Sequence, residues 1–226
     1  MSARAFDPSI YLVADVATLG DRDLAHVVGE AVAGGVTTVQ VRGKSISAAR
    51  LLGLVRDCAD AAAGRASVIV NDRVDVFLAA RDAGSDVAGV HVGQSDLPAT
   101  AVRGLVGPDA VVGLSASTPA NMAGVRSLPA GTVDYLGVGA VRATPTKPDH
   151  PDPLGWDGLR RAVAEAGGVP CVAIGGLGAG DAAHVRGAGA VGEAIVRVVC
   201  LAADPRQAAR ELAEEWAAAH GGGGTA

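Results

Sequence analysis

The chain has 226 residues, 49% of them hydrophobic and only 3% aromatic, and carries a net charge of -5 at pH 7. This length suits one large domain with a buried core, while the acidic balance argues against a nucleic-acid or anionic-membrane binder, which needs a basic face. The three cysteines, Cys58, Cys171 and Cys200, are scattered and odd in number, which argues against a disulfide framework or zinc site and fits a reducing cytoplasm.

Short β-rich runs alternate with alanine-rich helical stretches along the whole chain. Residues 1–10 lack the apolar core of a signal peptide, and residues 1–8 are expected to be a flexible tail. The β-rich runs are almost continuously apolar, as in parallel strands that are covered on both faces. We predict strands over 10–15, 37–42, 67–72, 89–93, 111–117, 133–139, 170–176 and 190–197, with helical segments between them such as 22–35, 48–64 and 157–167.

Eight βα units follow one another with no linker or break in composition. This pattern predicts an α/β fold, a single (β/α)8 TIM barrel that forms one domain over residues 1–226. An open, doubly wound sheet is the alternative, and the even spacing makes it the second choice. The apolar run at 194–203 is interrupted by Arg197 and is too short to span a bilayer. The glycine-rich end, residues 220–226, is expected to be a second flexible tail.

In a barrel of this kind the C-terminal ends of the strands build the active site, so the polar residues at those ends are candidates. Two of the 19 basic residues are lysines, Lys44 and Lys147, and both fall on this rim. In chain order the rim candidates are Gln40, Arg42, Lys44, Asn71, Asp72, Asp96, Ser115, Thr144, Thr146, Lys147, Gly175, Gly176 and Arg197.

Asp72 and Asp96 close neighbouring strands, which run about 4.8 Å apart. Magnesium is typically held by one or two carboxylates together with phosphate oxygens, so this pair can share a hard cation. The alternative is that Asp72 caps the helix that follows it. Because Asp96 and three cations, Arg42, Lys44 and Lys147, fall nearby, we favour a magnesium site beside a polyphosphate.

A second anion site is predicted after the seventh strand, where the sequence reads IGGLGAGD (174–181). Glycines let backbone N–H groups approach an anion at a helix N-terminus, and barrels often bind phosphate after strands seven and eight. A plain glycine-rich turn is the alternative. The proline-rich segment 139–153 falls between the two anion sites, and prolines can hold it rigid at little further cost in entropy.

These elements together resemble thiamine-phosphate synthases over about residues 10–215. The motifs Q-x-R-x-K (40–44), N-D (71–72), H-x-G-Q-x-D (91–96), G-x-S (113–115), T-x-T-K (144–147) and I-G-G (174–176) appear in order. Each is weak alone, but six in sequence are specific. The resemblance implies a transferase that joins hydroxymethylpyrimidine diphosphate to hydroxyethylthiazole phosphate, giving thiamine phosphate and diphosphate.

The resemblance also implies a role for each rim residue. In the family, the pyrimidine diphosphate is bound by residues matching Gln40, Arg42, Lys44, Asn71, Ser115 and Lys147, of which Lys147, Ser115, Arg42 and Lys44 are the expected catalytic set. Asp72 and Asp96 match the Mg²⁺ ligands. The thiazole phosphate is bound at positions matching Thr144, Pro145, Thr146, Gly176, Val196 and Arg197.

Chemistry agrees with this assignment. Loss of diphosphate leaves a resonance-stabilised pyrimidine cation, so the protein must mainly neutralise the leaving group and position the thiazole nitrogen. No general base is needed, and no histidine is placed among the rim candidates. The chain departs from the family pattern at Ser117 (commonly histidine), Ala140 (often proline), and Val191, Glu193 and Arg197, where an aspartate, an apolar residue and a serine are usual.

Three other functions compete with this interpretation. A thiazole tautomerase shares the barrel but lacks much of the diphosphate cluster. A non-catalytic phosphate-binding barrel is supported only by the departures in strand eight, and a phosphosugar isomerase would need a carboxylate or histidine base on the rim without that cluster. The expected partners are small phosphorylated substrates, not nucleic acid or membrane, and the sequence leaves the oligomeric state open, a homo-oligomer included.

Overall fold

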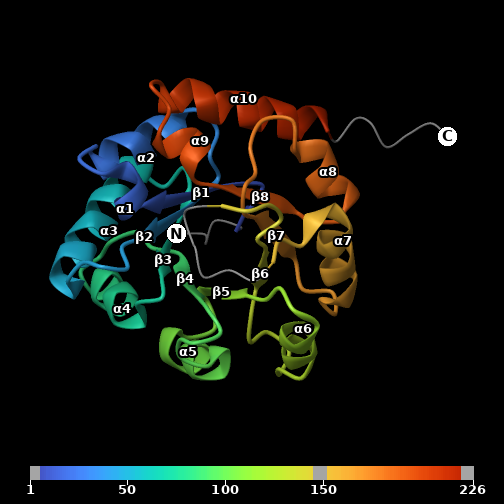
Figure 1. Ribbon diagram of the computed structural model, residues 1–226. Coiled ribbons are helices and arrows are strands. Elements are labelled where there is room, and N and C mark those ends of the chain that lie inside the picture. The colour runs from blue at the N-terminus through green and yellow to red at the C-terminus, as the bar shows by residue number, and fades with distance from the viewer. Residues whose placement is uncertain (1–5, 145–151, 220–226) are drawn as a thin grey trace.

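The computed structural model describes residues 6–144 and 152–219, in which eight parallel strands form a closed barrel (Figure 1). Each strand pairs with the next in sequence, and β8 pairs with β1 to close the sheet. The predicted (β/α)8 barrel is therefore confirmed, and the open sheet is excluded. The strands are β1 (Ile10–Asp15), β2 (Thr38–Arg42), β3 (Ser67–Asn71), β4 (Gly89–Val92), β5 (Val111–Ser115), β6 (Tyr135–Val138), β7 (Cys171–Ile174) and β8 (Gly192–Ile195).

Helices surround the barrel and cover the outer face of the sheet (Figure 1). Two helices follow β1 and two follow β8, and in both places the first is a single short turn. No helix in the described part of the chain is long and apolar enough to cross a membrane. The helices are α1 (Val16–Leu19), α2 (Leu24–Ala33), α3 (Ala48–Ala62), α4 (Val74–Asp82), α5 (Ala99–Val106), α6 (Pro119–Arg126), α7 (Gly155–Glu165), α8 (Ala182–Gly187), α9 (Arg197–Cys200) and α10 (Pro205–Ala218).

Several strands end earlier than predicted, because the last apolar residues leave the sheet to build the rim. The clearest case is β7, which ends before Gly175 and Gly176. Their φ angles are 100° and 68°, in the left-handed region that favours glycine. A Cβ on Gly175 would lie 2.5 Å from the Cβ of Ala140, and one on Gly176 would lie 2.7 Å from the Cβ of Arg142. The two glycines therefore let the chain after β6 pass close beside the end of β7.

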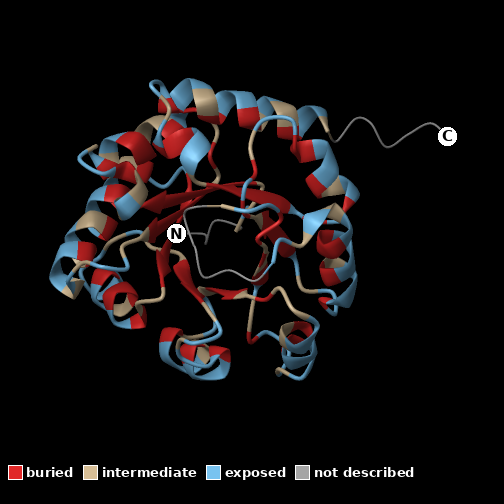
Figure 2. Ribbon diagram, in the orientation of Figure 1, coloured by how far each residue is buried: buried red, intermediate tan, exposed pale blue. Residues whose placement is uncertain are grey.

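The apolar core has two layers, and the strands between them are buried along their length (Figure 2). The larger layer is mainly aliphatic and lies between the sheet and the helices. The smaller layer fills the barrel interior, where the ring of Tyr135 needs the space left by Gly113. A Cβ on that glycine would lie 2.2 Å from the Tyr135 ring. The interior layer comprises Tyr11, Val13, Tyr135, Val172 and Ala194.

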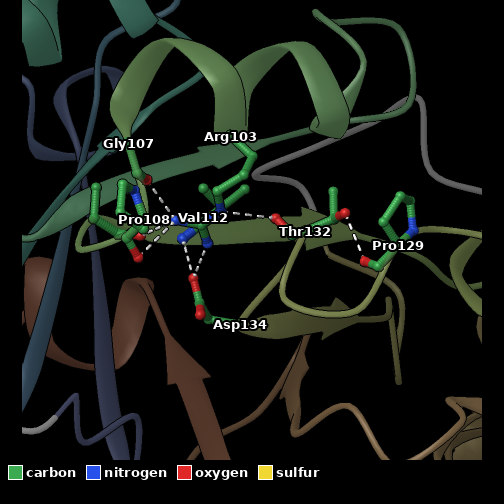
Figure 3. Close-up of polar contacts among 8 residues, drawn as sticks. Arg103, Gly107, Pro108, Val112, Pro129, Thr132 and Asp134 are labelled. Atoms are coloured by element: carbon green, nitrogen blue, oxygen red, sulfur yellow. Dashed lines mark hydrogen bonds and ion pairs between the residues drawn. The ribbon is translucent and has the colours of Figure 1, made fainter.

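At the N-terminal end of the barrel one arginine joins the loops that precede β5 and β6 (Figure 3). The Arg103 guanidinium donates to the carbonyl oxygens of Gly107 (2.8 Å) and Thr132 (3.3 Å) and to Asp134 Oδ2 (2.6 Å). The same carboxylate oxygen accepts the Val112 N–H at 2.6 Å. Contacts at the end opposite the rim serve the stability of a barrel of this kind, so this ion pair is a useful control for ion pairs at the site.

Glu193 lies in the core on the helix side of β8. Its register partners, Ile10 and Ala173, both belong to the layer between the sheet and the helices, and its side chain is fully buried. Neither carboxyl oxygen has a hydrogen-bond partner within the described residues. Burial, reinforced by the negative charges of Glu215 and Asp181, raises the pKa of Glu193 from 4.5 to about 8, so the side chain is neutral at pH 7.

We expect Glu193→Gln to remove a pH dependence from the stability of the fold. The folded state holds a proton on Glu193 that the unfolded chain releases above pH 4.5, so the free energy of unfolding falls as pH rises from 4.5 to about 8. At pH 7 this loss amounts to about 3 kcal/mol. In urea denaturation, the free energy of unfolding of Glu193→Gln should rise relative to that of wild type as pH rises from 5 to 8. The control is Glu214→Gln, a substitution at an exposed position. Parallel pH profiles for wild type and Glu193→Gln would contradict the assignment.

Candidate active site

The structure brings the predicted residues of β2, β3 and β4 together on one side of the rim. Lys44 Nζ lies 3.6 Å from Asp72 Oδ2, and the carboxylate of Asp96 acts on Asp72 both through its charge and through a side-chain hydrogen bond. Burial raises the pKa of Asp72, and the negative charge of Asp96 raises it further against the opposing effect of Lys44. Two acidic groups and one ammonium thus share a small, half-buried space, as the sequence predicted for three of its rim candidates.

The alternative role for Asp72, capping the next helix, is wrong. Helix α4 is preceded by Arg73, and no side chain caps its first turn. Asp72 instead has a φ of 61°, a conformation that is uncommon outside glycine and that clusters at functional sites. Asp96 is oriented separately, since its Oδ2 accepts the Gly93 N–H at 2.7 Å. Both carboxylates are therefore held at the rim by their own backbone, with Asn71 buried beside them at the end of β3.

Arg42 is anchored by a residue that the sequence analysis missed. Its Nη1 lies 2.5 Å from Oδ1 of Asp15, which ends β1 and is almost fully buried. The other oxygen, Oδ2, accepts the N–H and the hydroxyl of Thr18 at 3.0 Å and 2.8 Å. The position of Asp15 at the C-terminal end of the first predicted strand was the available signal. The ion pair fixes the guanidinium at the junction of β1 and β2.

A chain of polar side chains crosses the barrel interior and ends at Ser115. Gln40 Nε2 donates to the Tyr11 hydroxyl (2.9 Å), which lies 2.6 Å from the Tyr135 hydroxyl. The Tyr135 hydroxyl lies 2.9 Å from His91 Nδ1, and His91 Nε2 lies 2.9 Å from Ser115 Oγ. Gln40 therefore lies inside the barrel, at one end of a network whose other end is at the rim. His91 was present in the H-x-G-Q-x-D motif, but its side chain was not expected to reach Ser115.

The direction of this network follows from its members. Burial raises the pKa of both Tyr11 and Tyr135 well above the usual value, so each keeps one hydroxyl proton to donate. If Gln40 donates to Tyr11, each hydroxyl donates onward, and the last donates to His91 Nδ1. The imidazole proton then resides on Nε2 and is donated to Ser115 Oγ. This assignment leaves the Ser115 hydroxyl proton to be donated to a ligand at the rim.

Ser117, at the position where the family commonly has histidine, fastens β5 to β6. Its hydroxyl donates to the carbonyl oxygen of Gly139 and accepts the N–H of the same residue. Gln94, from the H-x-G-Q-x-D motif, adds a second link by donating from Nε2 to the Ser115 carbonyl oxygen at 2.6 Å. Both side chains position the ends of strands beside Ser115.

The glycine-rich segment after β7 offers fewer free N–H groups than predicted. Glu215 of α10 accepts the N–H of Gly180 (2.8 Å) and of Ala182 (3.0 Å). The start of α8 is therefore already satisfied by a carboxylate, and the second anion site stays a prediction that rests on other N–H groups of this end of the barrel. Within the described ranges, the N–H groups of Gly176, Val196 and Arg197 donate to no protein acceptor. These three N–H groups are among those left for a ligand at this end of the barrel.

Part of the predicted site lies outside the described residues, namely Pro145, Thr146 and Lys147. Thr144 is described and half-buried. The segment that leads to it is pinned to β7, because Val141 N–H donates to the Ile174 carbonyl oxygen at 2.9 Å. The segment that follows is pinned in turn, because Leu154 N–H donates to the Ala140 carbonyl oxygen at 2.9 Å.

Comparison with known proteins identifies the family. The family model described as thiamine monophosphate synthase matches residues 10–199. A thiamine-phosphate synthase from Solidesulfovibrio magneticus is 48% identical over 214 residues, which is 92% of this chain and 94% of that protein. Another from Albidiferax ferrireducens is 44% identical over 204 residues, or 90% of this chain and 89% of that one. The chain belongs to the thiamine monophosphate synthase family.

Solved structures agree with membership of the thiamine monophosphate synthase family. The thiamine phosphate pyrophosphorylase of Pyrococcus furiosus has a TM-score of 0.80 and 28% identity, and the match covers 94% of this chain and 97% of that one. A 3-hexulose-6-phosphate synthase, 18% identical with a TM-score of 0.66, shares the fold alone. The family, the thiamine-phosphate synthase activity and the transferase class that the sequence predicted are thus confirmed. The roles of individual rim residues stay predictions.

Proposed function

We propose that the rim holds two phosphorylated substrates in two different ways, as thiamine phosphate synthesis requires. The pyrimidine diphosphate would lie over β2 to β5, beside Lys44, Asp72 and Asp96. The thiazole phosphate would lie by β7 and β8, on the free N–H groups of Gly176 and Arg197. The observation that carries this proposal is the cluster in which Lys44 and two carboxylates share one half-buried space.

The residues present fit a magnesium ion. Two like charges close together, with the pKa of Asp72 raised by burial and by Asp96, form an arrangement that a divalent cation stabilises. Among residues 6–144 and 152–219, no group of three or more His, Cys, Asp or Glu side chains could hold a metal. The protein would therefore supply two carboxylates, and diphosphate oxygens and water the rest, as is usual for Mg²⁺. When bound, the ion would neutralise charge on the diphosphate.

In the reaction, the bond between the pyrimidine methylene carbon and the diphosphate oxygen breaks, and both electrons leave with the diphosphate. The aminopyrimidine ring stabilises the resulting cation, and the thiazole nitrogen then forms the new bond with its lone pair. Lys44, Arg42 and Lys147 would hold the departing diphosphate, where charge grows as the bond breaks. No proton leaves the thiazole nitrogen, so the site needs no general base.

Ser115 would bind the pyrimidine diphosphate as a hydrogen-bond donor. This role is supported by the interior network, because the donor order that starts at Gln40 puts the His91 proton on Nε2 and leaves the Ser115 hydroxyl proton for a ligand. Asn71 and Gln40 would contribute from the same side, Asn71 at the end of β3 and Gln40 through the network. The thiazole phosphate would be completed by Thr144, Pro145, Thr146 and the Val196 backbone, as the family resemblance implies.

The test is formation of thiamine phosphate from the two purified substrates by the purified protein, with and without Mg²⁺. We expect product and diphosphate in equal amounts, and a rate that depends on Mg²⁺. Absence of product, together with conversion of a thiazole carboxylate phosphate to its isomer, would favour the tautomerase alternative. Binding of phosphate compounds without either conversion would favour a non-catalytic barrel.

We expect Arg197→Ser to leave the KM for the thiazole phosphate nearly unchanged. The proposed contact is the Arg197 backbone N–H, which any residue supplies, and the side chain is exposed. Steady-state kinetics with the thiazole phosphate varied at saturating pyrimidine diphosphate measure this KM. A rise of about tenfold or more, worth some 1.4 kcal/mol, would mean that the guanidinium itself binds the phosphate.

Two further predictions concern the location and assembly of the protein. A cytoplasmic location is supported by Cys58, Cys171 and Cys200, all of which are free and buried, as expected for a reducing compartment. A homo-oligomer stays a prediction.

A further inference from the structure

One ion pair links the segments that leave β6 and β7. Arg142 Nη1 and Nη2 each lie 2.7 Å from an oxygen of Asp181, in a bidentate pair between residues that are 39 positions apart. Asp181 Oδ2 also accepts the Gly178 N–H at 3.0 Å, and Arg142 Nη1 donates to the Gly176 carbonyl oxygen at 3.2 Å. The pair therefore holds both ends of the turn 176–178.

The guanidinium is held from a second direction by aromatic rings. Its Cζ lies 4.9 Å from the centre of the Trp156 ring, and Trp156 in turn stacks on His184 at 5.0 Å with an interplanar angle of 17°. These rings come from α7 and α8, the helices that flank the turn. Arg142 is thus fixed by a carboxylate on its edge and a ring on its face, although its side chain is half exposed.

This pair differs from the exposed ion pairs on the helices, because exposed ion pairs contribute little to the stability of a fold. Its acceptor is almost fully buried, with 7% of the Asp181 side chain exposed, and the geometry is the two-point fork of arginine and carboxylate. It also binds the carbonyl oxygen of Gly176, whose own N–H has no acceptor within the described chain. Both residues of the pair form hydrogen bonds to the turn that contains the Gly176 N–H, so the pair fixes the shape of that turn.

We propose that Arg142 and Asp181 are positioning residues for the thiazole phosphate. They hold the turn 176–178 in the shape that aims the Gly176 N–H at the phosphate, and this inference rests on the proposed function. Asp181 and the Gly176 carbonyl oxygen take both hydrogens of Nη1 and one of Nη2, so the described hydrogen bonds of Arg142 are with the turn, and we infer that it acts through the turn. The pair is expected to act on this substrate alone, because its residues follow β6 and β7, whereas Lys44, Asp72 and Asp96 follow β2, β3 and β4.

The experiment compares Arg142→Ala, Asp181→Asn and the double variant in the synthesis of thiamine phosphate. Each single variant is expected to raise the KM for the thiazole phosphate about 10- to 100-fold through a misplaced turn, with the KM for the pyrimidine diphosphate unchanged. Because the two residues act as one unit, the double variant should be no worse than the poorer single variant. Arg142→Lys keeps the charge without the fork and should recover only part of the loss.

The matched control is Arg103→Ala, which removes an arginine–aspartate pair at the opposite end of the barrel. It should lower the melting temperature and leave both KM values at wild type, whereas the Arg142 variants should change the thiazole phosphate KM whatever their melting temperature. Fluorescence gives a second measurement, because Trp156 and Trp216 are the two tryptophans of the chain. In a Trp216→Phe background with Arg142 present, addition of the thiazole phosphate should change the Trp156 emission. In Arg142→Ala the same change should need a higher concentration of the thiazole phosphate.

Three results would overturn the inference. The first is an active wild type whose thiazole phosphate KM is unchanged in Arg142→Ala. The second is a raised KM in Arg142→Ala but not in Asp181→Asn, which would mean that Arg142 contacts the phosphate itself. The third is an equal rise in both KM values. A wild type that forms no product refutes the proposed function instead, and fluorescence titration with the thiazole phosphate then tests the turn separately.

Discussion

Asp72→Asn is expected to lower kcat/KM for the pyrimidine diphosphate by more than about 100-fold at limiting Mg²⁺. Mutation of a residue that hydrogen-bonds a metal ligand typically lowers metal affinity or activity 10- to 100-fold, so loss of a ligand itself should lower them at least as much. Asn keeps the size of the side chain but removes the charge that, next to Asp96, creates a place for a divalent cation. Raising the Mg²⁺ concentration should restore activity only in part. Asp96→Asn should behave in the same way.

The matched control for this substitution is Asp75→Asn, three residues further along. Asp75 is exposed in the first turn of α4 and pairs with Arg73 at 2.5 Å, and this pairing lowers the pKa of Asp75. Removing its charge should leave the Mg²⁺ dependence of the rate at wild type. Full activity of Asp72→Asn and Asp96→Asn in limiting Mg²⁺ would contradict the metal assignment.

Lys147→Ala is expected to lower kcat by about 10²–10³-fold, the typical cost of removing one preorganised donor to a developing charge. Negative charge grows on the diphosphate as it leaves, so an ammonium placed there binds the transition state better than the ground state. The KM for the thiazole phosphate should change little. Lys147 lies outside the described residues, so this prediction rests on the T-x-T-K motif and on its place after β6.

Lys147→Arg separates charge from shape. A planar guanidinium cannot occupy the place of a compact ammonium, so this variant should recover only part of the lost kcat. The control is Arg160→Ala on α7, whose exposed guanidinium pairs with Asp157 one turn earlier, and it should keep wild-type kinetics. Wild-type kcat in Lys147→Ala would show that the proline-rich segment is a connector without a part in the chemistry.

The barrel could be predicted because each strand is a short apolar run that only a sheet covered on both faces can bury. The rim followed from the fold, since βα loops bring residues as distant as Lys44 and Asp72 to one edge. The positions of the strand ends were predicted less accurately, because in the sequence Gly175 and Gly176 continue the apolar run of β7. Only the approach of the chain after β6 shows why these glycines leave the sheet.

The contacts that organise the site could not be predicted, because they join residues that are far apart in the sequence. Tyr11 and Tyr135 looked like apolar strand residues, and their hydroxyls meet only when the barrel closes. Asp15 had a signal, its place at a strand end, but no partner could be assigned to it from sequence. Arg142 and Asp181 lacked even that signal, since nothing in a proline-rich segment indicates which carboxylate its arginine will meet.

The central claim is that one rim holds two anion sites, of which only that at β2 to β5 uses a metal. Isothermal titration calorimetry of each substrate separately, in Mg²⁺ and again in a chelator, tests it most directly. We predict that removing Mg²⁺ abolishes or strongly weakens binding of the pyrimidine diphosphate and leaves the affinity for the thiazole phosphate unchanged. Equal loss of both affinities, or a pyrimidine diphosphate affinity that does not depend on Mg²⁺, would contradict the account.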